Sequence, residues 1–236
     1  MTLQAEYLKI SCSEGPGLRM KVKETVYADQ SDYQRIAIYD TEVYGRCLFL
    51  DDVIQCSETD HKVYDTAILG KLGSANKNLL VLGGGDGHTA QMALSLNPGL
   101  RVTVVELDKA VVKACETYLD QDIYHHPNIT IVIDDAIHFM EQTSVGSYDC
   151  VVCDLTDMPI GHNGVVCKEF YQKVFSHVHR VLNRSGWIAV YAGCDVEIAD
   201  DIARAYAHHI EKRTVYVPSF GEPCFIVYGR NIQHIS

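Results

Sequence analysis

The sequence predicts an α/β fold in which a mostly parallel sheet is covered by helices and preceded by a small β region. From Asn78 onward, short continuous apolar runs alternate with amphipathic helical segments, a pattern typical of strands buried on both faces. Residues 1–70 lack this alternation and instead carry β-branched and aromatic runs separated by Asp, Ser and Gly. We therefore expect an N-terminal β-strand domain over residues 1–70 and an α/β domain over residues 71–236.

Three strands are expected in the N-terminal region, and the β-branched and aromatic content of each run predicts them: Leu18–Val26, Gln34–Tyr39 and Arg46–Leu50. The stretch Tyr44-Gly45-Arg46 predicts a hairpin turn, because glycine there tolerates a tight backbone bend. The region as a whole is interpreted as strands and turns.

In the α/β region, continuous apolar runs predict five strands: Asn78–Leu82, Val102–Val105, Ile129–Ile133, Tyr148–Cys153 and Trp187–Tyr191. Helical periodicity predicts a helix after the glycine loop that ends near Leu96, followed by four more: Lys109–Tyr118, Ala136–Glu141, Glu169–Leu182 and Glu197–Ile210. Two further strands close the chain.

Composition limits the classes of function. The net charge of −11 argues against a nucleic-acid surface. No apolar run approaches the ~20 residues that a membrane helix needs, and the first residues lack the order of a signal peptide. The nine scattered cysteines favour free thiols in a reducing cytoplasm. Cys150 and Cys153 would point to opposite faces of one strand. With no clustered cysteines and no H-x-x-x-H pattern, we expect no metal site.

Candidate ligand-binding residues lie where the predicted strands end, because ligands of parallel sheets bind at the carboxyl ends of the strands. Acidic residues gather at four of these ends: Gly83–Gly87, Glu106, Asp134–Asp135 and Asp154–Asp157. The residues at these strand ends are therefore the candidate ligand-binding site.

The glycine-rich turn Gly83-Gly84-Gly85-Asp86-Gly87 follows a strand and opens a helix. Glycines such as Gly83 and Gly85 let the backbone approach a ligand closely, but His88 replaces the third glycine of the dinucleotide fingerprint. A carboxylate at Asp86 repels phosphate and suits a cationic or hydroxylated ligand. The alternative is that Asp86 only caps the helix.

The next two strand ends each leave two interpretations open. Glu106 can accept hydrogen bonds from both hydroxyls of a ribose, or it is a solvated acid at the end of a strand. Asp135 can accept a hydrogen bond from an adenine amino group, or it caps the helix that follows.

Two carboxylates, Asp154 and Asp157, leave the fourth strand for a loop. An alkylamine has a solution pKa of ~10, like lysine, and is protonated near neutral pH. One carboxylate can orient such an amine and accept its proton, and the second can hold another ammonium group of the same molecule. The alternative is a helix cap and a surface acid.

The chain resembles the spermidine/spermine synthases in four ordered motifs: Asp51-Asp52-Val53-Ile54-Gln55-Cys56-Ser57-Glu58-Thr59-Asp60, then Tyr64, then Val81-Leu82-Gly83-Gly84-Gly85-Asp86-Gly87, then Val105-Glu106-Leu107-Asp108. The resemblance implies a small N-terminal β domain on a methyltransferase-like (Rossmann-like), doubly wound, mostly parallel sheet. It also implies an aminopropyltransferase that uses decarboxylated S-adenosylmethionine as co-substrate, releases methylthioadenosine and holds no permanently bound cofactor.

The resemblance carries residue roles to this chain. It implies that Gln34 touches the nucleoside part of the donor, that Asp86 grips the donor's ammonium group, and that Glu106 binds the ribose. It likewise implies that Asp135 lies on the adenine side, that Asp154 is the base beside the attacking amine, and that Tyr64 lines the acceptor channel.

The acceptor is harder to assign. Glu222 matches a glutamate that faces spermidine in spermine synthases, whereas Asp157 is the second acid that spermidine synthases keep. Asp65 stands where spermidine synthases usually carry glutamine. We favour spermidine as acceptor, with putrescine close behind, and we expect a cytoplasmic homodimer. Two alternatives stay open: a methyltransferase that uses intact S-adenosylmethionine, and a non-catalytic homologue that regulates a partner.

Overall fold

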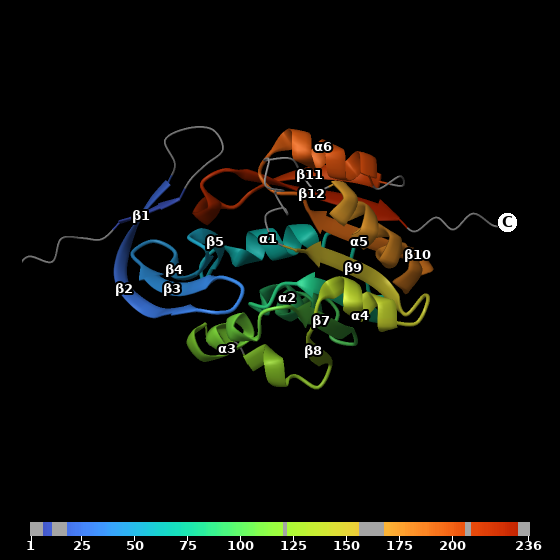
Figure 1. Cartoon of the computed structure of the whole chain (residues 1–236), viewed down its shortest axis with the longest axis horizontal. Coiled ribbons are helices and arrows are strands. Elements are labelled where there is room, and N and C mark those ends of the chain that lie inside the picture. Colours follow the sequence, from blue (N-terminus) through green and yellow to red (C-terminus); the bar gives the residue numbers. More distant parts are fainter. Residues whose placement is uncertain (1–6, 11–17, 120–121, 156–167, 206–208, 231–236) are drawn as a thin grey trace, which may run out of the picture.

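The computed structural model of the protein describes residues 7–10, 18–119, 122–155, 168–205 and 209–230. Over these residues the chain forms two sheets, one of five strands and one of seven. Figure 1 shows the five-stranded sheet at one end of the molecule, and the seven-stranded sheet with its helices makes up the rest.

The N-terminal sheet is an antiparallel meander in which each strand pairs with the next along the chain. Its strands are β1 (Tyr7–Ile10), β2 (Leu18–Gln30), β3 (Arg35–Thr41), β4 (Gly45–Leu50) and β5 (Val53–Ser57). The predicted hairpin turn is confirmed, with Gly45 at a φ of 67° where β4 begins. Strands β1 and β5 were not predicted.

The second sheet has the strand order β11-β12-β10-β9-β6-β7-β8. Its strands are β6 (Asn78–Gly83), β7 (Arg101–Glu106), β8 (Ile129–Ile133), β9 (Tyr148–Asp154), β10 (Leu182–Tyr191), β11 (His209–Tyr216) and β12 (Pro223–Arg230). All neighbouring pairs from β10 to β8 are parallel, and β12 runs antiparallel to both of its neighbours. The predicted mostly parallel α/β fold is confirmed.

The strand order reverses between β6 and β9, because β7 and β8 lie on one side of β6 and the later strands lie on the other. At such a switch point the loops that follow the two central strands diverge and leave a crevice for a ligand. In this fold the crevice lies between the loops after Gly83 and Asp154, which are paired residues at the ends of β6 and β9.

Helices cover both faces of this sheet. They are α1 (His61–Ile68), α2 (His88–Leu96), α3 (Lys109–Tyr118), α4 (Ala136–Gln142), α5 (Lys168–Val181) and α6 (Val196–Ala205). Two short 3-10 helices, η1 (Asp122–His125) and η2 (Pro218–Phe220), lie in the connections. Helices α1 and α2 belong to the buried cluster on one face, and α5 and α6 belong to the cluster on the other. Cys150 and Cys153 fall in these two different clusters, so the prediction that they face opposite ways is confirmed.

Two predictions about helices were wrong. Helix α1 lies in the region predicted to hold only strands and turns. It was not predicted because His61 and Asp65 stand on its inward face and interrupt the apolar periodicity that indicates a helix. The helix predicted to reach Ile210 ends at Ala205, and β11 begins at His209. Strand β11 pairs with β12 as the edge of the sheet, so sheet pairing outweighs the local helical pattern there.

The N-terminal sheet packs on helix α3 through a shared apolar cluster. Ile36, Ile38 and Leu48 of the sheet meet Val111 and Cys115 of α3, and all five side chains are buried. This contact fixes the sheet beside the strand ends of the second domain. Among the described residues, no helix has the length and apolar character that crossing a membrane requires.

Candidate active site

A cavity of about 330 Å³ opens at the carboxyl ends of β6, β7 and β9, within the size range of small-molecule sites. Residues predicted from the sequence line it from both domains: Gln34, Tyr64, Gly83, Gly85, Asp86, Glu106, Asp135 and Asp154. The structure therefore brings together residues spread over more than half of the chain.

Two predicted residues are not among those that line the cavity. Asp157 lies outside the described residues. Glu222 lies between η2 and β12, two residues after Phe220, which does line the cavity. The segment that carries Glu222 thus reaches the edge of the site.

Gly83, the first glycine of the loop, has no room for a side chain because strand β9 lies next to it. Gly83 has a φ of 80°, and a Cβ there would lie 2.1 Å from the carbonyl oxygen of Asp154. Only glycine fits a left-handed position this close to another backbone. The glycine loop and Asp154 consequently lie against each other at the switch point.

Glu106 is held by backbone amides. Its Oε2 accepts a hydrogen bond from the N–H of Gly85 at 3.1 Å, and its Oε1 accepts one from the N–H of Asp108 at 2.9 Å. Burial raises the pKa of Glu106, and these two N–H groups act in the opposite direction. A half-buried, oriented carboxylate of this kind differs from a solvated acid at the end of a strand.

Asp86 and Asp135 both interact with the helices that follow them. Asp86 Oδ1 accepts from the N–H of His88 at 2.8 Å, and Asp135 Oδ1 accepts from the N–H groups of Ile137 and His138 at 2.9 Å. Both aspartates also line the cavity. Helix capping and ligand binding are therefore compatible at these two positions.

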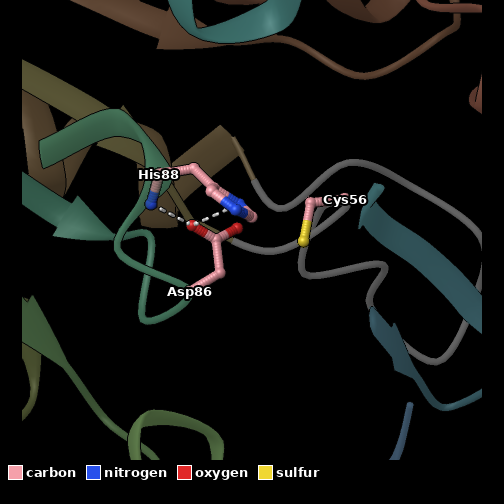
Figure 2. Close-up of side chains that lie close together, drawn as sticks. All are labelled: Cys56, Asp86 and His88. Atoms are coloured by element: carbon pink, nitrogen blue, oxygen red, sulfur yellow. Dashed lines mark hydrogen bonds and ion pairs between the residues drawn. The ribbon is translucent and has the colours of Figure 1, made fainter. Parts of the chain in front are cut away.

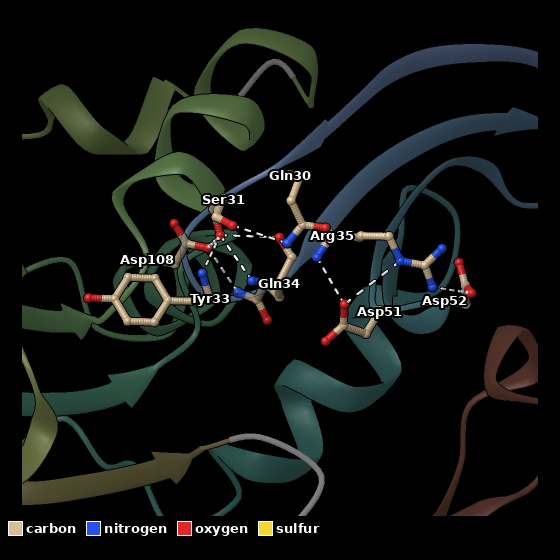
Figure 3. A network of polar contacts seen from close by, with 8 residues as sticks. All are labelled: Gln30, Ser31, Tyr33, Gln34, Arg35, Asp51, Asp52 and Asp108. Carbon is tan, nitrogen blue, oxygen red and sulfur yellow. Dashed lines mark hydrogen bonds and ion pairs between the residues drawn. The ribbon is translucent and has the colours of Figure 1, made fainter.

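The N-terminal sheet reaches the cavity through a polar network around Asp108 (Figure 3). The Ser31 hydroxyl and the Gln34 side-chain amide donate to Asp108 Oδ2 at 2.6 and 3.1 Å. The other oxygen of Asp108 accepts from the N–H of Ala110 and caps α3. Gln34 is thereby fixed next to the turn that carries Glu106.

Tyr64 and Asp154 make up another part of the cavity lining. The Tyr64 hydroxyl donates to Asp154 Oδ1 at 2.7 Å. Burial and the adjacent Asp154 carboxylate raise the pKa of Tyr64 well above its ordinary value, so the phenol stays a donor. The Tyr64 ring meets Tyr191 edge-on at 5.7 Å and lies 6.2 Å from Phe220, which gives this side an aromatic wall.

Four more polar residues lie together in the cavity lining: His61, Asp65, His88 and Thr89. The contacts among them were not predicted from the sequence. His61 Nδ1 lies 2.7 Å from Asp65 Oδ2, and the Thr89 hydroxyl donates to Asp65 Oδ1 at 2.8 Å. Burial raises the pKa of Asp65. The spacing of four residues between His61 and Asp65 was a signal for one helix face.

Asp60 was missed as well. It accepts hydrogen bonds from the Ser57 hydroxyl at 2.6 Å and from the N–H of Ser219 at 2.7 Å. Because Ser219 lies in η2, Asp60 anchors Phe220 and the segment of Glu222 against the end of β5. Nothing local in the sequence connects residues so far apart in the chain.

Family models match nearly the whole described chain. Residues 62–228 match the spermine/spermidine synthase domain, and residues 7–58 match the spermidine synthase tetramerisation domain. The chain belongs to the spermine/spermidine synthase family. The resemblance predicted from the sequence motifs is therefore confirmed.

Two curated relatives and one solved structure show how similar this chain is to other proteins. The polyamine aminopropyltransferase of Pyrobaculum calidifontis is 29% identical and the match covers 92% of this chain and 79% of that protein. The polyamine aminopropyltransferase of a Ruegeria species is 30% identical, with 89% and 77% covered. A crystal structure of spermidine synthase in complex with the transition-state analogue AdoDATO has a TM-score of 0.81 at 22% identity, covering 100% of this chain and 85% of that one. This likeness confirms the fold.

Proposed function

We propose that this protein is a polyamine aminopropyltransferase, a transferase that moves an aminopropyl group from decarboxylated S-adenosylmethionine to a polyamine and releases methylthioadenosine. Family membership supports this activity, as do relatives that carry the name polyamine aminopropyltransferase. The observation that carries the proposal is the Tyr64–Asp154 pair, which lines the same cavity as the glycine loop and Glu106.

On the donor side, Glu106 accepts hydrogen bonds from the two ribose hydroxyls, and Gln34 and Asp135 bind other parts of the nucleoside. Asp86 pairs with the ammonium group of the aminopropyl chain. Intact S-adenosylmethionine would bring a carboxylate toward Asp86, and two like charges at close range repel. This contact favours aminopropyl transfer over methyl transfer.

On the acceptor side, Asp154 orients the attacking amine and takes its proton, and Tyr64 fixes the Asp154 carboxylate. The amine nitrogen forms a bond to the carbon next to sulfur while the carbon–sulfur bond breaks. The electron pair of that bond neutralises the sulfonium, and methylthioadenosine leaves as a neutral thioether. Alignment of nitrogen, carbon and sulfur supplies much of the rate. The intact Tyr64–Asp154 pair disfavours a non-catalytic homologue.

Spermidine is the proposed acceptor, with putrescine close behind. The Asp60 contacts hold the segment of Glu222 at the edge of the cavity, where its carboxylate can pair with a second ammonium group of a long polyamine. Asp157 is proposed for the same kind of contact. The aromatic wall of Tyr64, Tyr191 and Phe220 suits the methylene chain between the amines.

The proposed assembly is a homo-oligomer, with a cytoplasmic homodimer as the specific form. The match of residues 7–58 to a tetramerisation domain supports assembly through the N-terminal sheet. We also propose that residues 1–70 and 71–236 act as two domains, since the two family models divide the chain in nearly the same place. Light scattering behind a sizing column distinguishes a dimer from a tetramer.

The activity is tested by incubating the protein with decarboxylated S-adenosylmethionine and either putrescine, spermidine or agmatine, followed by mass spectrometry of the products. A gain of one aminopropyl unit on any acceptor confirms the chemistry and identifies the acceptor. Glu222→Gln should raise the KM for spermidine more than that for putrescine. A protein that binds methylthioadenosine but yields no product with any acceptor would contradict the proposed enzyme.

A further inference from the structure

Three side chains with metal-binding atoms face one another in the cavity (Figure 2). They are Cys56 from β5, Asp86 from the glycine loop and His88 from the start of α2. One ligand atom from each lies within 4.8 Å of the other two. The residues are far apart in the sequence or irregularly spaced, so no sequence pattern indicated a metal site there.

The His88 ring supplies a second observation. The side chain is only 7% exposed, and its Nδ1 has no hydrogen-bond partner among the described residues. Asp86 Oδ1 lies 3.7 Å from this nitrogen, which is too long for a hydrogen bond. A buried polar atom without a partner destabilises the fold, and a cation between the imidazole and the carboxylate would satisfy both groups.

The ring is also held in place from behind. His61 stacks on His88 with ring centroids 3.9 Å apart and planes inclined by 22°. His61 is itself paired with Asp65, which accepts from Thr89. Outer contacts of this kind orient metal ligands in proteins.

We propose that Cys56, Asp86 and His88 bind a zinc ion, with the fourth coordination position open to water or to a ligand. One thiolate, one imidazole and one carboxylate form the mixed sulfur, nitrogen and oxygen set that Zn²⁺ accepts, whereas Mg²⁺ and Ca²⁺ prefer oxygen alone. Zinc bonds of about 2.0–2.3 Å require the three ligand atoms to move closer to one another than the 4.8 Å within which they lie. A thiolate and a carboxylate together neutralise the charge of the ion.

This site has a consequence that rests on the proposed function. A zinc ion on Asp86 would neutralise its carboxylate and repel the donor's ammonium group, because two like charges at close range repel. Zinc and decarboxylated S-adenosylmethionine therefore exclude each other, and zinc inhibits the enzyme by competing with its donor. Methylthioadenosine lacks the aminopropyl ammonium and is compatible with the ion.

The site is tested on the metal-free full chain by titration with Co²⁺, which replaces zinc and gives visible absorption bands. We expect a thiolate-to-cobalt charge-transfer band, together with bands typical of a four-coordinate ion, and added Zn²⁺ should remove them. Cys56→Ala should lose the charge-transfer band. Cys150→Ala, the matched removal of a buried thiol from β9, should keep it.

Two further variants distinguish the loss of a metal ligand from a folding defect. Cys56→Ser keeps the size of the side chain and should lose the band as well. His88→Ala should weaken cobalt binding by at least about 100-fold, the upper end of what the loss of a supporting outer contact costs. No charge-transfer band in the unaltered protein, or a band that persists in both Cys56 variants, would overturn the site.

The competition is tested separately with the two nucleosides. Decarboxylated S-adenosylmethionine should remove the cobalt bands, and methylthioadenosine should leave them in place. If the donor binds and the bands stay, the shared role of Asp86 is wrong. If neither nucleoside binds, the proposed enzyme function fails, while the cobalt spectrum still decides the metal site.

Discussion

The two sides of the cavity hold their carboxylates in different ways. On the proposed donor side, Asp86, Glu106 and Asp135 all accept hydrogen bonds from backbone N–H groups of nearby strand–helix turns. On the proposed acceptor side, Asp154 accepts from the hydroxyl of Tyr64, which lies 90 residues away in the sequence. The first three carboxylates are thus fixed by the turns that carry them, whereas the position of Tyr64 against Asp154 depends on how distant elements pack. If the proposed roles hold, we expect a few substitutions to change the acceptor while the donor stays the same.

The largest loss of activity is expected from Asp154→Asn on the proposed acceptor side. Removing the proposed base should lower kcat by about 10²–10⁴-fold, the usual contribution of general-base catalysis. Binding of methylthioadenosine, measured by calorimetry, should not change, because the donor side keeps its contacts. Asp201→Asn on the exposed face of α6 is the matched control and should keep full activity. Unchanged turnover in Asp154→Asn would remove the residue from the chemistry.

The boundary between the two sides is tested by Gly83→Ala. The new Cβ would meet the Asp154 carbonyl oxygen at 2.1 Å, in addition to the strain of a φ of 80°. Gly193→Ala is the control, because Gly193 has a φ of 70° and no atom within 4 Å of its Cβ position. We expect Gly83→Ala to lower the free energy of unfolding by at least about 2 kcal/mol more than the control. Equal melting temperatures for the two variants would contradict the close approach.

The donor side is tested by Glu106→Gln. The neutral amide accepts more weakly from the ribose hydroxyls, and hydrogen bonds to a charged group contribute about 1.5–3 kcal/mol. Affinity for methylthioadenosine should fall by about 10–100-fold. Glu116→Gln on α3 is the control and should bind normally. If the affinity of Glu106→Gln does not move, the ribose assignment is wrong.

A smaller effect is expected from Tyr64→Phe, which keeps the aromatic wall and removes the hydrogen bond to Asp154. Turnover should fall by about tenfold, since one hydrogen bond to a carboxylate is lost. The KM for the donor should stay unchanged. A larger loss in donor binding than in kcat would move Tyr64 from the acceptor side to the donor side.

The smallest effect is a pH dependence of nucleoside binding. Burial places the pKa of Glu106 above its ordinary value of 4.5, and only the ionised form accepts from both ribose hydroxyls. Affinity for methylthioadenosine should therefore decline as the pH falls toward that raised pKa, beginning above pH 4.5. Calorimetry from neutral to acidic pH should show this decline in the unaltered protein and not in Glu106→Gln.

How much the sequence could predict follows the same division. The strands β6 to β9 and the residues at their ends were predicted because each strand carries a continuous apolar run and is closed or followed by an acidic residue. Helix α1 was missed because His61 and Asp65 occupy the face that would otherwise be apolar. The role of Asp60 could not be predicted, since its partner Ser219 is brought near only by the complete sheet. Local chemistry was readable from the sequence, and contacts between distant segments were not.

The contact between Asp108 and the N-terminal sheet limits how the family can exchange parts. Asp108 caps α3, follows the turn of Glu106 and receives hydrogen bonds from Ser31 and Gln34. A sheet grafted from another family member would have to bring its own donors for this aspartate and its own apolar partners for α3. The N-terminal sheet and the strand end that carries Glu106 are thus expected to change together in evolution.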